Sequence, residues 1–133
     1  MTLIESDSAT IHASPSQVKA YIINANNLKN LLPEGKFTDW TSDDQSCSFR
    51  IQNAYTIGLE LVSENDAGEV VYKSSKGSPF AFTLTAQLTP INGATEAKLI
   101  CHAEMNSFLE LLVKNPLRNL FNHMAKRISE LPL

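Results

Sequence analysis

Two carboxylates near the N-terminus have the spacing that acid–base chemistry would need. Glu5 and Asp7 lie two residues apart in a strand-like run, on the same phase as Leu3 and Ala9. With strict alternation both would point inward, where burial and mutual repulsion would raise a carboxyl pKa. A bulge between Asp7 and Ala9, or a place at the solvated end of the sheet, would turn them outward. The sequence favours the outward arrangement, so we assign no catalytic residue.

The histidines and cysteines form no metal-ligand or nucleophile pattern. His12, His102 and His123 are isolated in the sequence, and the last two fall on polar faces. Cys47 and Cys101 lie on apolar strand phases, which predicts buried free thiols. No Gly-rich loop precedes a helix, as a phosphate-binding loop would require. We therefore predict neither a metal nor a cofactor.

Apolar and aromatic side chains are the stronger candidates for a site. Strand alternation and helix periodicity place them on surfaces that would face one another. Such side chains can line a cavity for an apolar ligand, with tyrosine hydroxyls as polar contacts. The candidates are Trp40, Phe49, Tyr55, Ile57, Leu59, Tyr72, Phe82, Leu84, Leu117, Phe121 and Met124. For any one of them, packing in a filled core is the alternative role.

A strand and two short helices are expected to begin the fold. The strand covers Thr2 to Ala13. Ser14 then suits an N-cap, Pro15 suits the first helical position, and Gln17 completes a capping box. A second short helix is expected over about residues 26–32, ended by the Pro and Gly that follow. It would bury Leu28, Leu31 and Leu32.

The middle of the chain has the two-residue period of half-buried strands. Strands are predicted over residues 36–41, 46–51, 55–61, 69–76, 80–89 and 95–105. The segments between them, residues 42–45, 52–53, 65–68, 77–79 and 90–93, are short and rich in turn-forming residues. Consecutive one-sided strands with short connections predict an antiparallel meander with one wet face.

One amphipathic helix is predicted at the C-terminal end, from Pro116 to Leu131, with Asn115 as its cap. Residues 107–114 would form a short helical link, and a single kinked helix is the alternative. The apolar stripe comprises Leu117, Leu120, Phe121, Met124, Ile128 and Leu131. This stripe needs an apolar partner, and the face of the meander is the only large one.

The order of these elements, with the opening run Ala13-Ser14-Pro15-Ser16-Gln17-Val18, resembles the START-like helix-grip superfamily (SRPBCC). That group includes lipid-transfer START domains, polyketide cyclases and aromatases, and birch-pollen-allergen-like proteins. The resemblance covers residues 1–133 as one domain. It implies an α+β fold in which a seven-stranded curved antiparallel sheet wraps around the long C-terminal helix. Two short helices would lie between strands 1 and 2, and a cavity between sheet and helix would hold an apolar or amphipathic ligand.

The chain departs from the superfamily in two respects. Lys19-Ala20-Tyr21 follows Val18, where many relatives place an aromatic residue, often Trp. The extra N-terminal elements of the larger lipid-transfer domains are absent, so a full phospholipid is not the expected ligand. The resemblance therefore implies a smaller molecule.

The sequence and the resemblance together predict a non-enzymatic binder or carrier of a small hydrophobic molecule. An enzyme of the cyclase, aromatase or isomerase type is one alternative, and a co-chaperone-like protein-interaction module is another. A net charge of −3 with scattered basic residues argues against nucleic-acid binding. The chain carries no apolar run long enough for membrane insertion and no signal peptide, which predicts a cytoplasmic protein. A homodimer is left open.

Overall fold

The computed structural model describes residues 2–51, 55–65, 68–75 and 77–133. The strands are β1 (Thr2–Glu5), β2 (Ala9–Ile11), β3 (Phe37–Ser42), β4 (Ser46–Ile51), β5 (Thr56–Asn65), β6 (Glu69–Ser74), β7 (Ala81–Ile91) and β8 (Ala94–Glu104). The helices are α1 (Pro15–Ile22), the 3-10 helix η1 (Ala25–Leu31) and α2 (Ser107–Ser129). The predicted turn at 52–53, the centre of the turn at 65–68 and the predicted strand end at Lys76 lie outside the described residues.

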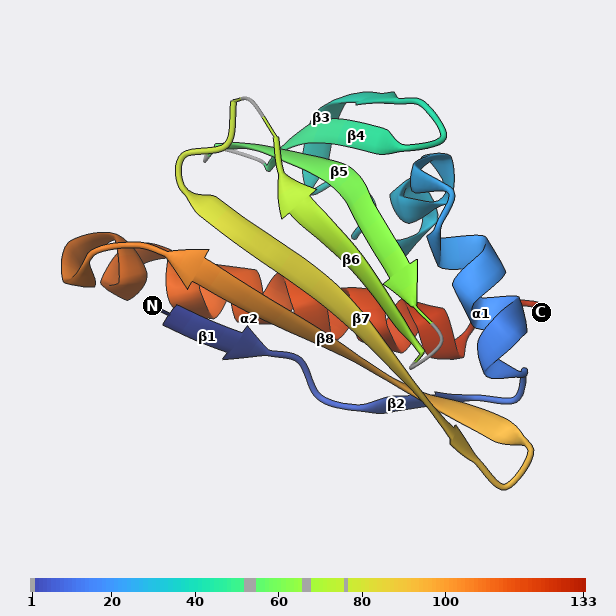
Figure 1. Ribbon diagram of the computed structural model, residues 1–133. Coiled ribbons are helices and arrows are strands. Elements are labelled where there is room, and N and C mark those ends of the chain that lie inside the picture. The colour runs from blue at the N-terminus through green and yellow to red at the C-terminus, as the bar shows by residue number, and fades with distance from the viewer. Residues whose placement is uncertain (1, 52–54, 66–67, 76) are drawn as a thin grey trace.

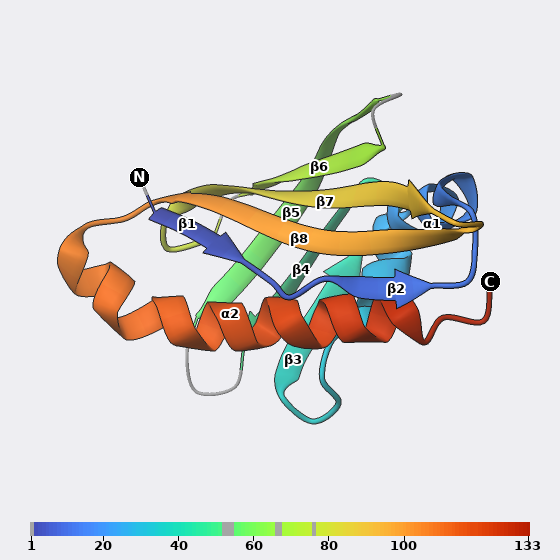
Figure 2. The same ribbon diagram turned by 90° about the horizontal axis from the view of Figure 1, so that it is seen from below.

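The strands form one antiparallel sheet, and α2 lies along one face of it (Figures 1 and 2). The strand order is β1-β8-β7-β6-β5-β4-β3, and β2 pairs with the far part of β8. Helices α1 and η1 connect β2 to β3, as predicted. The α+β class, the curved antiparallel sheet and the long closing helix are therefore confirmed.

The predicted first strand is interrupted, and its inward face switches at the break. Glu5 pairs with Ile100 whereas Ala9 pairs with Ala97, so this edge has one more residue than β8 between the two pairs. Ser6 bridges the break: its N–H donates to the Leu99 carbonyl and its Oγ accepts from the Leu99 N–H, both at 2.9 Å. The bulge alternative was correct. The inward placement of Leu3 was wrong, because that side chain is 46% exposed.

The short helices begin where the sequence indicates. The Ser14 N–H donates to Gln17 Oε1 at 3.0 Å, and the Gln17 N–H donates to Ser14 Oγ at 3.2 Å. This reciprocal capping box satisfies two N–H groups that have no partner inside the helix. Asn24 caps η1 in the same way, by accepting from the Asn26 N–H at 3.1 Å. The leucines of this region, Leu28, Leu31 and Leu32, are buried as predicted.

The β7–β8 hairpin is longer than predicted. Pairing continues to Ile91 and Ala94, so only Asn92 and Gly93 form the turn. Their φ angles are 41° and 81°, the left-handed values that a two-residue hairpin turn of the primed type requires. Pro90 lies within β7 near the hairpin tip. These two strands form the longest pairing in the sheet and provide a broad apolar surface for α2.

The C-terminal helix is continuous, and the separate link expected over residues 107–114 was wrong. Asn106 is the N-cap, and its Oδ1 accepts from the Leu109 N–H at 2.8 Å. Pro116 lies inside the helix, and Figure 2 shows the first turns bent away from the rest. Val113 is buried on the same stripe as Leu117. Buried side chains on both sides of Pro116, Val113 and Leu117, therefore lie on the same face of one continuous helix.

Candidate ligand-binding site

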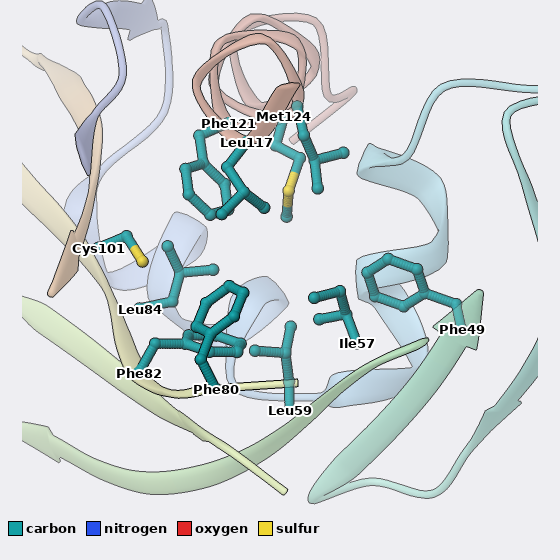
Figure 3. Close-up of a pocket in the computed structure, with 11 residues that line it drawn as sticks. Phe49, Ile57, Leu59, Phe80, Phe82, Leu84, Cys101, Leu117, Phe121 and Met124 are labelled. Atoms are coloured by element: carbon teal, nitrogen blue, oxygen red, sulfur yellow. The ribbon is translucent and has the colours of Figure 1, made fainter. Parts of the chain in front are cut away.

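The apolar stripe of α2 faces the sheet, as the periodicity predicts. Figure 3 shows Leu117, Phe121 and Met124 pointing from the helix toward side chains of β4, β5, β7 and β8. All three are buried, whereas Leu120 at the edge of the stripe is partly exposed. The sheet contributes Phe49, Ile57, Leu59, Phe82 and Leu84 from its alternating inward positions.

A small apolar void, here called the core cavity, lies between these two surfaces. Its volume is about 10 Å³, close to the smallest space that holds one water molecule. The lining comprises Phe49, Ile57, Leu59, Phe80, Phe82, Leu84, Cys101, Leu117, Leu120, Phe121 and Met124. Among the residues that the structure describes, no charged side chain lines it.

The core cavity is far smaller than the few hundred Å³ that ligand pockets typically have. Aromatic rings occupy the space. Phe80 and Phe82 lie with ring centroids 5.5 Å apart, and Tyr55 packs edge-on against Phe80 at 6.4 Å. Sequence alternation gives the direction of each side chain but not the sheet curvature, which sets how much volume these rings must fill.

Eight of the predicted ligand-binding residues line the core cavity, and three do not. Trp40 stacks behind Phe49, with ring centroids 5.9 Å apart, and its Nε1 donates to Ser42 Oγ at 3.1 Å. Tyr55 packs outside Phe80. Tyr72 is buried beside a second void of about 20 Å³. Those that line the cavity are Phe49, Ile57, Leu59, Phe82, Leu84, Leu117, Phe121 and Met124.

Trp40 is displaced by an irregularity of β3. The pairing between β3 and β4 shifts register between Thr38 and Thr41, and Asp39 adopts a φ of 57°. This left-handed residue rotates the strand. Phe37 and Trp40 are therefore both half-buried, although they are three positions apart and would point to opposite faces of a regular strand. The sequence Thr38-Asp39-Trp40 contains an Asp, which tolerates this conformation better than most residues. That signal alone does not indicate a bulge.

Sequence reasoning omitted three cavity residues: Phe80, Cys101 and Leu120. Phe80 lies just before β7, within the strand predicted over residues 80–89, and shares the phase of Phe82 and Leu84, so the alternation could have included it. Cys101 is on the inward phase of β8. It was predicted to be a buried thiol and was not included among the ligand-binding residues. Leu120 belongs to the α2 stripe and could have been included on that ground.

Glu5 and Asp7 lie away from the cavity, so the inward arrangement considered for them was wrong. Glu5 forms an ion pair with Lys98 at 2.9 Å, and both side chains are partly exposed. Asp7 is exposed, and its backbone N–H donates to Asn122 Oδ1 at 2.7 Å. Neither carboxylate can reach a molecule held under α2.

The buried ionisable groups near the sheet are neutral. Burial raises the pKa of the Cys101 thiol to about 12. Burial, with a smaller contribution from the Asp43 charge, raises the pKa of the Cys47 thiol to about 12 as well. Burial also raises the pKa of Tyr72 above its ordinary value. Both cysteines are free and buried, as predicted. Within the described ranges, no group of three or more ligand side chains could hold a metal ion.

Two open grooves continue from the core cavity along α2. The first, here called the side groove, has a volume of about 290 Å³ and shares Phe49 and Leu120 with the core cavity. Its lining is Leu32, Pro33, Lys36, Phe37, Phe49, Ile51, Pro116, Asn119, Leu120 and His123. The second, here called the basic groove, shares Leu32, Phe37 and His123 with the side groove. Its volume is about 610 Å³.

Solved structures of other proteins have the same arrangement of sheet and helix. KanY aligns with a TM-score of 0.77 at 10% identity, over 98% of this chain and 97% of its own. XoxI from Bacillus cereus aligns with a TM-score of 0.75 at 18% identity, over 98% and 94%. Truncated norcoclaurine synthase from Thalictrum flavum aligns with a TM-score of 0.75 at 16% identity, over 99% and 93%.

The chain has the START-like helix-grip fold. These identities show the fold alone, so the neighbours' activities are not transferred by the likeness. No protein-family model and no curated protein sequence matches the chain. No helix in the described part of the chain is long and apolar enough to cross a membrane. The likeness covers the arrangement of the sheet and α2, and the residues named above line the space between them.

Proposed function

We propose that the protein binds a small hydrophobic molecule between the sheet and α2, and that it does so without catalysing a reaction. The observation that supports this most directly is the lining of the core cavity. Among the described residues that line it, all side chains are apolar, and the Cys101 thiol, a weak donor held neutral by burial, is the only hydrogen-bond donor. Burial of apolar ligand surface contributes about 25 cal/mol of binding free energy per Å². A lining of this kind would bind a ligand mainly through this hydrophobic term.

Binding requires the core cavity to expand, and the side groove provides the route. Phe49 and Leu120 line both the core cavity and the side groove, so the two spaces adjoin at these side chains. Leu120 is only partly buried, so a rotation of its side chain joins the two spaces. Met124 adapts to an occupant because its unbranched side chain has several accessible rotamers. We propose that a ligand displaces these side chains as it enters.

A neutral fluorescent probe tests the proposal. N-phenyl-1-naphthylamine should bind the native protein with one-to-one stoichiometry. Leu84 lines both the core cavity and the second void, so Leu84→Trp should fill this space and weaken binding. Leu84→Phe gives a milder test if the Trp variant is unstable. Leu3→Trp is the matched control, because Leu3 is exposed on the outer face. No binding, or equal binding by the Leu84→Trp and Leu3→Trp variants, contradicts the proposal.

A protein-interaction role is the second candidate, and one surface favours it. Phe108, Leu111 and Leu112, in the first turns of α2, are 72%, 83% and 56% exposed. An apolar surface of this kind is typical of contact sites. It becomes the leading interpretation if the core cavity admits no ligand.

An enzyme of the cyclase, aromatase or isomerase type has less support. One structural neighbour is a synthase, but Glu5 and Asp7, the acid–base pair considered for such a reaction, are partly or fully exposed and do not line the core cavity. Cytoplasmic location remains a prediction from the sequence, and the oligomeric state remains open.

A further inference from the structure

We infer that the ligand is an amphipathic anion, with its apolar part extending from the core cavity into the side groove and its acidic head group in the basic groove. The inference rests on the proposed function and specifies the class of molecule. It is carried by the distribution of charge along the surface that leads out of the core cavity. This surface changes from apolar at one end to basic at the other.

The basic groove lies between η1, the segment that follows it, and the second half of α2. Its lining is Lys29, Asn30, Leu32, Glu34, Phe37, His123 and Arg127. Arg127 is held at the wall of this groove by two contacts. Its Nε donates to the Asn30 carbonyl at 3.4 Å, and its guanidinium forms an ion pair with Glu130 at 3.2 Å. A guanidinium has five N–H donors, so others remain for a ligand.

Positive charge is concentrated here although the chain as a whole is acidic. Lys29, Lys36 and Arg127 line the two grooves, and Glu34 is the only carboxylate among the lining residues. The chain carries a net charge of −3. Among the described residues, the side chains of Lys29 and Lys36 have no hydrogen-bond or ion-pair partner. Glu34 in the lining and Glu130, which pairs with Arg127, offset part of this charge. Three cations against two carboxylates leave a positive excess, which raises the local concentration of an anionic ligand.

The apolar part of this surface leads toward the core cavity. Phe37, Phe49, Ile51 and Leu120 line the side groove, and Phe49 and Leu120 also line the core cavity under α2. Leu32, Phe37 and His123 join the side groove to the basic groove. A neutral apolar molecule would leave the cations unused, and a cationic one would be repelled. A molecule with an alkyl or aryl body and a carboxylate head matches both parts.

Three ten-carbon probes with different head groups test the inference. Decanoate, decanol and decyltrimethylammonium are titrated by calorimetry at neutral pH, below the concentrations at which they form micelles. We expect decanoate to bind most tightly and decyltrimethylammonium most weakly, with the preference shrinking as salt is added. Lys29→Gln, Lys36→Gln and Arg127→Gln should each weaken decanoate by about two- to fivefold, the range of exposed charge pairs. The same variants should leave decanol binding unchanged.

Lys126→Gln is the matched control, because Lys126 is an exposed cation next to Arg127 in sequence and lines neither groove. The inference is overturned, and the proposed function stands, if decanol binds at least as tightly as decanoate. It is also overturned if Lys126→Gln weakens decanoate as much as the groove variants do. If none of the three probes binds, the proposed function fails and the inference fails with it.

Discussion

The hydroxyl of Tyr72 donates a hydrogen bond to the backbone carbonyl of Ile22 at 2.6 Å, joining the centre of the sheet to the end of α1. Both residues are buried. Tyr72 was expected to offer its hydroxyl to a ligand, but this bond already uses its donor. The tyrosine therefore holds α1 and η1 against the sheet, beside the space that the ligand would occupy.

Tyr72→Phe should destabilise the protein by about 1–2 kcal/mol, because the Ile22 carbonyl would remain buried without its partner. Urea unfolding measures this loss. Binding of N-phenyl-1-naphthylamine should stay within about twofold of the native value, since the ring is retained. A stable variant that loses probe binding would instead show that the hydroxyl is a ligand contact.

Met124→Asp should unfold the protein or reduce its stability by several kcal/mol, because a carboxylate would be buried without a partner under the sheet. Asn119→Asp introduces the same charge at an exposed position of α2 and should change stability little. Thermal unfolding of both variants checks the assignment. Equal melting temperatures would mean that the stripe of α2 does not face the sheet.

The buried thiols should resist modification at ordinary pH. The pKa of both Cys47 and Cys101 is raised by burial from 9.0 to about 12, so the reactive thiolate is scarce in the folded state. Because the folded-state pKa is the higher one, the stability from burying neutral thiols is fully present below pH 9. It is lost as the pH rises toward about 12. Rapid labelling by a thiol reagent at pH 8 in the native state would contradict this.

Glu5→Gln should leave both stability and ligand binding almost unchanged. The ion pair with Lys98 is partly exposed, so its removal should alter the free energy of unfolding by less than about 1 kcal/mol. Urea unfolding and probe titration check the two expectations. A large loss of probe binding would show that Glu5 contributes to the ligand site and would favour the enzymatic alternative.

The sequence predicted those parts of the fold that depend on local periodicity and capping. The alternation around Phe82 and Leu84 marks β7, and the spacing of Leu117, Phe121 and Met124 marks the buried face of α2. The Ser14–Gln17 capping box joins two residues three positions apart and is found where expected. These features were predictable because each is determined by residues close together in the chain.

The rest depends on relationships between distant segments. The face switch at Ser6 is specified by pairing with Leu99, far along the chain, and the strand sequence alone fits either arrangement. The small volume of the core cavity results from sheet curvature and from the volumes of the aromatic rings on several strands. The basic groove joins Lys29 and Arg127, which only the packing of η1 against α2 brings together.

The central claim is that a small apolar molecule enters the space between the sheet and α2. Methyl NMR spectra recorded during a titration with decanol test it most directly. The account predicts shifts at Leu59, Leu84 and Met124, which line the core cavity, with little change at the exposed Leu111 and Leu112. Shifts confined to Leu111 and Leu112, or no shifts at saturating decanol, would contradict it.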